Sequence, residues 1–136
     1  MLNIQQQCFK ADYKFYKDDE TSPYCENIAD IEFGIIHNDH FTILSQDKII
    51  GAIEVKETKD RYHLYKLFID EAQQSQGIGK MIVNQIFNIL SKEKHWTVYT
   101  PHKNLKNHYF YESLGFKKYR EDNISKNLNL FKYIKQ

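Results

Sequence analysis

Proline and glycine, the residues that most often interrupt helices and strands, are scarce in this sequence, with two prolines and five glycines among 136 residues. Such a low content excludes a collagen-like chain and is not typical of a flexible linker. Aromatic residues instead make up 15% of the chain, enough bulky side chains to fill a core in a protein of this length. We therefore expect one folded domain over residues 1–136.

Cysteines and long apolar runs are also rare. The two cysteines, Cys8 and Cys25, and the six histidines show no spacing that is typical of a structural zinc site, so we expect free thiols and no metal. No apolar run approaches the ~18–20 residues of a membrane span, and no signal-peptide pattern opens the chain. These absences predict a cytoplasmic protein without a membrane partner.

The net charge is only +1, but the charges are spread unevenly. Residues 1–39 carry three lysines against eight acidic residues, whereas residues 40–136 carry sixteen basic against ten acidic residues. A basic region can bind a polyanion and an acidic one can attract a cation, although ordinary surface scatter gives similar counts. No nucleic-acid-binding motif accompanies the basic region, so we expect no nucleic-acid partner.

Hydrophobic periodicity and turn residues predict the order of the structural elements. Apolar residues recur at three and four positions from Ile78 to Leu90, which is typical of an amphipathic helix. The other expected helices cover residues 2–9, from Ser22-Pro23 to about Phe33, and from Asn104 to Gly115, and a loop is expected over residues 12–20. The expected strands cover residues 41–44 and 49–55 (a hairpin), 62–69, 96–100, 116–119 and 128–134. This order predicts an α+β fold, with a mixed sheet between helices on both faces.

A glycine-containing segment, Gln74–Lys80, joins the strand expected at residues 62–69 to the amphipathic helix. The first turn of a helix exposes unpaired N–H groups and the positive end of the helix dipole, and glycine lets a phosphate approach that backbone. The segment therefore suits a pyrophosphate, although two glycines can also simply allow a tight turn. Its spacing excludes a Walker loop, and the segment does not match a Rossmann dinucleotide-binding fingerprint.

A second pattern follows about 30 residues later along the chain. Asn104 and Tyr111 are seven residues apart, so they share one face of the expected helix, which ends in the sequence Tyr111–Phe116. Together the two patterns resemble the GNAT superfamily of N-acetyltransferases. Gln74, Gly77 and Gly79 match the phosphate motif of that family, and Asn104 with Tyr111–Phe116 matches its later signature. The resemblance covers roughly residues 40–120.

The resemblance implies a GNAT-like, mostly antiparallel sheet and acetyl-CoA as co-substrate, with no metal. The family usually has an extra strand before its first helix; here a helix comes first, so that edge strand would be missing. The residues implied to bind the cofactor lie on the strand, in the loop and on the later helix: Leu67, Phe68, Ile69, Gln74, Ser75, Gln76, Gly77, Ile78, Gly79, Lys80, Asn104 and Tyr111. The family often has a basic residue where Gln76 stands, which gives Lys80 and the backbone more weight.

The implied reaction is direct attack of a primary amine on the thioester. By resemblance, Tyr111 is the general acid that protonates the CoA thiolate, and a phenol of pKa ~10 is reasonably matched to that task. His63, with an ordinary pKa of ~6.5, and Glu54 are the candidate bases, and each is equally explained as a plain strand residue. The alternative function is a catalytically silent CoA-binding or regulatory interaction module, which has no need of a proton donor at the sulfur.

The acceptor is implied to be a small-molecule or peptide amine, and the family tends to form homodimers. Carboxylates crowd residues 12–26 among aromatic side chains, which favours an acceptor with a second positive charge. A solvated acidic loop whose aromatic residues turn into the core explains the same residues.

Overall fold

The structure is a computed structural model that describes residues 2–16, 23–74, 77–90 and 94–136. The four helices are α1 (Leu2–Tyr16), α2 (Ile28–His37), α3 (Ile78–Ile89) and α4 (Leu105–Ser113), with short 3-10 turns at Pro23–Cys25 and Glu71–Gln73. The six strands are β1 (Asp39–Ser45), β2 (Lys48–Glu57), β3 (Arg61–Ile69), β4 (His95–Pro101), β5 (Lys117–Ser125) and β6 (Leu128–Lys135).

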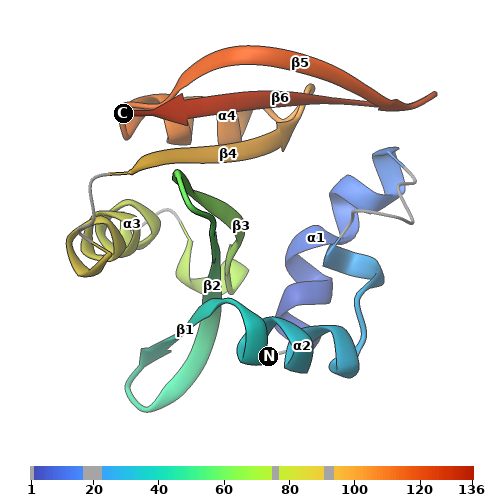
Figure 1. Ribbon diagram of the computed structural model, residues 1–136. Helices are drawn as coiled ribbons and strands as arrows, with labels where there is room; N and C mark the ends of the chain where they lie inside the picture. The colour runs from blue at the N-terminus through green and yellow to red at the C-terminus, as the bar shows by residue number, and fades with distance from the viewer. Residues whose placement is uncertain (1, 17–22, 75–76, 91–93) are drawn as a thin grey trace.

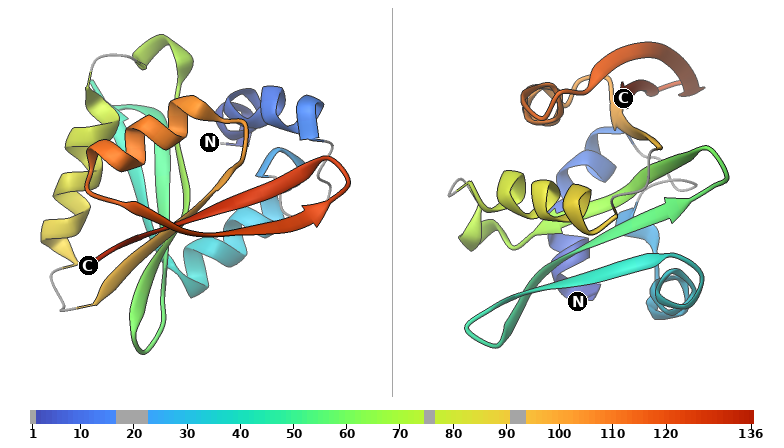
Figure 2. Two further views of the ribbon diagram at one scale, coloured as in Figure 1. Left: turned by 90° about the horizontal axis from the view of Figure 1, so that it is seen from above. Right: turned by 60° about the vertical axis from the view of Figure 1, so that its left-hand side comes forward.

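The strands form one sheet in the order β1-β2-β3-β4-β6-β5, in which only the β3–β4 pair is parallel. Helices α1 and α2 cover one face, and α3 and α4 cover the other (Figures 1 and 2). The largest cluster of buried residues joins the sheet to α3 and α4 and includes Tyr62, Val83, Trp96, Tyr111 and Phe116. The expected α+β fold with helices on both faces is confirmed. The structure describes no strand ahead of α1, and β1 is an edge of the sheet.

The N-terminal region differs from the expectation in the length of its first helix. Helix α1 continues to Tyr16, so the loop predicted over residues 12–20 is wrong in its first part. The rest of that loop, residues 17–20, lies outside the described residues, as does Ser22.

The second helix begins later than Ser22-Pro23, because a stronger cap lies further along the chain. The Asn27 side chain accepts a hydrogen bond from the Asp30 N–H, and the Asp30 side chain accepts one from the Asn27 N–H, both at 2.9 Å. This reciprocal capping satisfies two backbone donors at the start of the helix. Pro23 instead opens a 3-10 turn, and α2 continues beyond Phe33 to His37.

The remaining elements lie where they were expected, with longer strands. Gln46 and Asp47 connect β1 to β2 with φ angles of 51° and 63°, the left-handed conformation that tight hairpin turns require. Gly115, with φ of 95°, follows the end of α4 in the left-handed position that glycine favours there.

The centre of the sheet opens between β3 and β4. These strands pair only over residues 61–64 and 95–98, and beyond that point they diverge (Figure 1). On its other side β3 pairs with β2, and the register shifts between the Glu54–Lys66 and Val55–Leu64 pairs, which leaves Tyr65 as an extra residue. Such a bulge bends a strand and redirects its side chains. The second half of β3 therefore presents an edge without a partner strand among the described residues.

Candidate active site

The open edge of β3 carries backbone groups of known direction. The Asp70 N–H donates to the Ile50 carbonyl, toward β2. Because successive residues of a strand direct their backbone groups to opposite sides, Phe68 faces β2, whereas Leu67 and Ile69 face the opening. Of the three residues expected along the cofactor, Phe68 thus keeps its backbone away from this edge. Its ring packs against Phe9 of α1, with the centroids 6.1 Å apart.

The end of β3 is tied to the segment that follows it. The Ile69 carbonyl accepts hydrogen bonds from the Gln74 side-chain amide at 2.8 Å and from the Cys8 thiol at 3.1 Å. Burial, with Glu71 and Asp70 nearby, raises the pKa of Cys8 to about 11, so this thiol stays protonated. Gln74 also accepts a hydrogen bond from Lys106 Nζ of α4 at 3.2 Å. Gln74 therefore joins β3 to α4 beside the glycine-containing segment.

The N-terminus of α3 begins at a glycine. Gly77 is the N-cap with φ of 74°, no side chain of the described residues caps the first turn, and that turn contains no acidic residue. A Cβ atom at Gly77 would meet nothing within 4 Å, so no described atom occupies the space beside this residue. Lys80 is exposed one turn further on. Ser75 and Gln76, also predicted to bind the cofactor, lie outside the described residues.

The next two positions of the segment serve packing. Ile78 packs on the apolar cluster of Ile43, Ile50 and Ile69. A Cβ atom at Gly79 would lie 3.3 Å from the Phe110 ring, so glycine here permits the close approach of α3 to α4. The two glycines of the pattern thus have different structural reasons, conformation at Gly77 and packing at Gly79.

Tyr111 lies on α4 at the large apolar cluster and is 7% exposed. Burial raises the pKa of this phenol, which keeps it protonated. Its ring meets Phe110 and Phe116 edge-on, with centroids 5.1 and 5.8 Å away. Asn104 is the N-cap of α4, and its side chain accepts a hydrogen bond from the Asn107 N–H at 3.1 Å. Sequence reasoning missed this capping role, which the Asn-before-helix pattern could have indicated.

His63 lies on the face of the sheet that α1 and α2 cover, half-buried beside β4. Its Nδ1 atom is 2.8 Å from Thr97 Oγ1, and its ring centroid is 4.3 Å from that of Tyr99. Burial above all lowers the pKa of His63 to about 4, with smaller effects from Arg61, Lys56 and Lys132. The imidazole is therefore neutral at pH 7, and it is a weaker base than its ordinary pKa of ~6.5 suggested.

Glu54 is buried on the same side of the sheet. It is 3% exposed, and its Oε2 accepts a hydrogen bond from the Asn38 side chain at 3.0 Å. Its Oε1 lies 3.9 Å from Lys66 Nζ and so close to Gly34 of α2 that a Cβ there would approach within 2.2 Å. Such burial fits a carboxylate that holds α2 to the sheet better than one that meets an acceptor.

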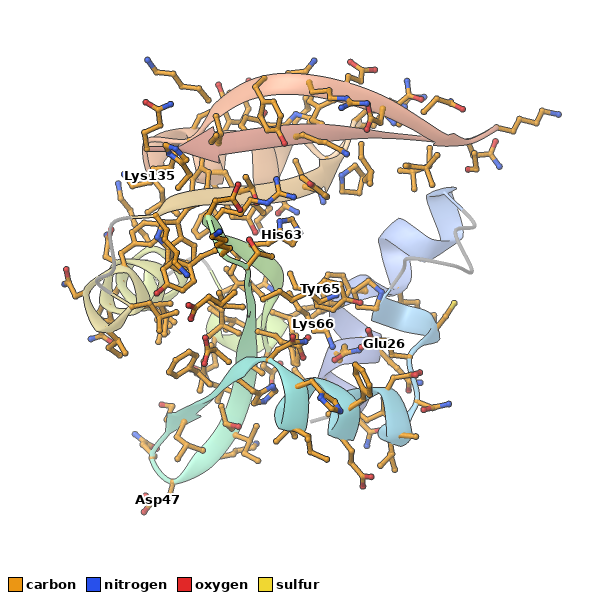
Figure 3. All side chains as sticks on the ribbon, viewed as in Figure 1. Glu26, Asp47, His63, Tyr65, Lys66 and Lys135 are labelled. Carbon is orange, nitrogen blue, oxygen red and sulfur yellow. The ribbon has the colours of Figure 1, made fainter. Side chains whose placement is uncertain are left out.

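Sequence reasoning missed a buried polar cluster around Lys66, which is 5% exposed. Lys66 Nζ forms an ion pair with Glu26 and donates to the Gln5 side chain at 3.2 Å. The Gln5 amide also donates to Glu26 at 2.8 Å, and the Tyr65 hydroxyl donates to the same carboxylate at 3.0 Å. Figure 3 shows Glu26, Tyr65 and Lys66 between β3 and the turn that precedes α2. The cluster fixes the chain before α2 against the bulge of β3.

Metal-binding clusters and membrane-spanning helices are both absent from the described residues. Among the described residues, no group of three or more histidine, cysteine or carboxylate side chains is placed to hold a metal ion. None of the described helices has the length and apolar character that a membrane crossing requires.

Comparison with known proteins gives a consistent picture. Residues 20–136 match the family model described as "Acetyltransferase (GNAT) domain". No curated protein sequence matches the chain. Similar solved structures include a GNAT family acetyltransferase from Elizabethkingia anophelis with acetyl-CoA bound, at a TM-score of 0.70 and 15% identity over 81% of this chain and 83% of that one.

Two other solved structures share the fold at similarly low identity. The ribosomal-protein-S18-alanine N-acetyltransferase from Escherichia coli has a TM-score of 0.74 and 16% identity, over 93% of this chain and 86% of that one. An aminoglycoside 6′-N-acetyltransferase complexed with coenzyme A has a TM-score of 0.70 and 13% identity, over 98% and 89% of the two chains.

Proposed function

The chain belongs to the GNAT family of acetyltransferases, and from this premise we propose that it transfers the acetyl group of acetyl-CoA to a primary amine by direct attack. As a member of this family it is an acetyl-CoA-dependent acyltransferase. The acceptor is a small-molecule or peptide amine. A cytoplasmic location and a homodimer stay predictions.

The observation that carries the proposal is the β3 edge that has no partner strand among the described residues, followed along the chain by the start of α3, where glycine stands at the N-cap. An extended chain with amide groups can complete a strand edge by backbone hydrogen bonds, and the pantetheine arm of CoA has two amides. The backbone groups of Leu67 and the N–H of Ile69 face such an arm, whereas the Ile69 carbonyl is already hydrogen-bonded to Gln74 and Cys8. The pyrophosphate would then bind the N–H groups after Gly77, where the helix dipole is positive. Lys80 and Lys106 add positive charge there.

The chemical step needs an oxyanion site and a proton donor. The amine nitrogen bonds to the thioester carbonyl carbon, the carbon–sulfur bond breaks, and the sulfur receives the Tyr111 proton. Among the residues that the structure describes, none hydrogen-bonds the Tyr111 hydroxyl, which is consistent with a donor kept for a ligand. The Leu67 N–H is the candidate to stabilise the developing oxyanion.

Removal of the amine proton involves a weak base. With its pKa at about 4, His63 does not bind a proton firmly near pH 7. We therefore propose that the acceptor reacts as the neutral amine and that water carries its proton away, with His63 as a relay at most. Glu54 is proposed as a positioning residue, because its carboxylate is engaged beneath α2.

The alternative is a GNAT domain that binds CoA without turnover. A thiol reagent that detects free CoA, combined with mass spectrometry of a panel of amines, separates the two functions. The proposal expects CoA release to depend on an added amine and an equal amount of acetylated product. Binding of acetyl-CoA with no acetylated product from any amine would favour the silent module.

A further inference from the structure

Cationic side chains surround His63 on the face of the sheet opposite α3. Lys56 is the cross-strand neighbour of His63 on β2, and Arg61 begins the same strand as His63. Lys132 comes from β6, where it pairs with Tyr99 of β4. The positive charges of all three residues lower the pKa of His63, so each of them lies near enough to this ring to act on it.

Aromatic rings hold two of these cations in place. Lys56 Nζ lies 3.6 Å from the centre of the Tyr65 ring, and Lys132 Nζ lies 4.5 Å from the centre of the Tyr99 ring. Such cation–π contacts fix the position of an ammonium without cancelling its charge. Both rings lie where β3 and β4 begin to part, so the cations border the opening of the sheet.

The charges here are only partly neutralised. Lys132 forms an ion pair with Asp122 at 2.7 Å. Among the described residues, no carboxylate lies within ion-pair distance of Lys56 or Arg61. The Tyr65 hydroxyl donates to the carboxylate of Glu26, and this carboxylate already binds Lys66 and Gln5. The described surface around His63 therefore carries excess positive charge.

This surface lies on the face of the sheet from which the acceptor amine would approach the thioester. The pyrophosphate site lies at α3, on one face of the sheet, and the thioester would reach through the opening. The amine must then approach from the other face, where His63, Tyr65 and Tyr99 lie.

The geometry points to an acceptor amine that also carries an anionic group, in its simplest form a carboxylate. Lys56 and Arg61 bind this group, and the inference rests on the proposed function. The acidic residues 12–26 favoured an acceptor with a second positive charge, whereas this inference gives the acceptor a negative charge. The side chains of residues 11–22 lie outside the described ones, whereas the cations around His63 are placed. Lys56 Nζ lies 3.6 Å from the centre of the Tyr65 ring, and Tyr65 is two residues, about 7 Å along a strand, from Leu67, so a six-carbon chain spans the distance from the thioester to this ammonium.

Three matched six-carbon amines test the inference: 6-aminohexanoate, hexylamine and 1,6-diaminohexane. We expect the largest kcat/KM for 6-aminohexanoate and the smallest for the diamine, with a preference that shrinks as salt rises. In the Lys56→Gln, Arg61→Gln double variant, the ratio of 6-aminohexanoate to hexylamine should fall at least tenfold. Lys59→Gln removes the same charge from the exposed turn between β2 and β3 and should keep the wild-type ratio.

The outcomes separate this inference from the proposed function. Acetylation of all three amines without a preference for the carboxylate, or an unchanged ratio in the double variant, would overturn the inference and leave the acetyltransferase intact. If none of the amines is acetylated, the melting temperature of the CoA-bound protein decides. A rise with 6-aminohexanoate that the double variant loses supports the anionic subsite, and no rise refutes it.

Discussion

Substitution of Gly77 separates backbone conformation from cofactor binding. Gly77 has φ of 74°, and a Cβ there would meet no atom within 4 Å. A residue other than glycine in the left-handed region costs about 1–2 kcal/mol, and no clash adds to that cost. Gly77→Ala should therefore lower the free energy of unfolding by about 1–2 kcal/mol. Gly115→Ala is the control away from the phosphate site: Gly115 also has positive φ, at 95°, and follows α4, and a Cβ there would in addition lie 2.8 Å from Lys135 Nζ.

The ligand response of these variants tests the phosphate site. Acetyl-CoA at a hundred times its Kd should stabilise the wild-type protein by about 2.7 kcal/mol. Gly77→Glu places a carboxylate in the proposed phosphate path, and a hundredfold weaker affinity would reduce this stabilisation to about 0.4 kcal/mol by the same relation. Gly115→Ala should keep the full effect. Thermal unfolding with and without acetyl-CoA measures both quantities, and a full ligand effect in Gly77→Glu would refute the assignment of the phosphate site.

Three further predictions concern stability. Because the folded pKa of His63 is about 4 against an ordinary 6.5, its neutral form stabilises the fold above pH 6.5, and this contribution is lost as pH falls toward 4. Wild type should lose about 2–3 kcal/mol more than His63→Gln between pH 7 and 4.5 in urea unfolding; equal losses would contradict the shift. Gly34→Ala should destabilise by about 1–3 kcal/mol, because its Cβ would lie 2.2 Å from a Glu54 oxygen; the gain usual for alanine in a helix would refute this packing. Asn27→Ala should cost about 1 kcal/mol through the lost cap, and an unchanged midpoint would show that the capping box with Asp30 contributes nothing.

Local patterns predicted the part of the fold in which neighbouring residues determine the structure. The three- and four-residue spacing from Ile78 and the glycine at position 115 located α3 and the end of α4 correctly. The start of α2 was missed because Ser22-Pro23 resembles a helix start, while the cap at Asn27 depends on its reciprocal bond with Asp30. That second signal was present in the sequence.

The features that shape the site depend on contacts between distant residues. Gln5 and Lys66 are 61 positions apart, and nothing in their local sequence indicates that a lysine is buried there. The bulge at Tyr65 follows from the pairing of β3 with β2, and the pKa of His63 depends on burial and on Lys132 of a remote strand. Periodicity cannot predict such effects, because it describes only one element at a time.

We propose above all that this chain carries out acetyl transfer with Tyr111 as the proton donor to sulfur. Tyr111→Phe removes only the hydroxyl from a ring that packs edge-on against Phe116. The most direct test is the single-turnover rate of acetyl transfer, together with the Kd of acetyl-CoA, for wild type and variant. We expect an unchanged Kd and a rate at least tenfold lower, because a general acid typically contributes ~10²–10⁴-fold. An equal rate, with chemistry shown to be the limiting step, would contradict the claim.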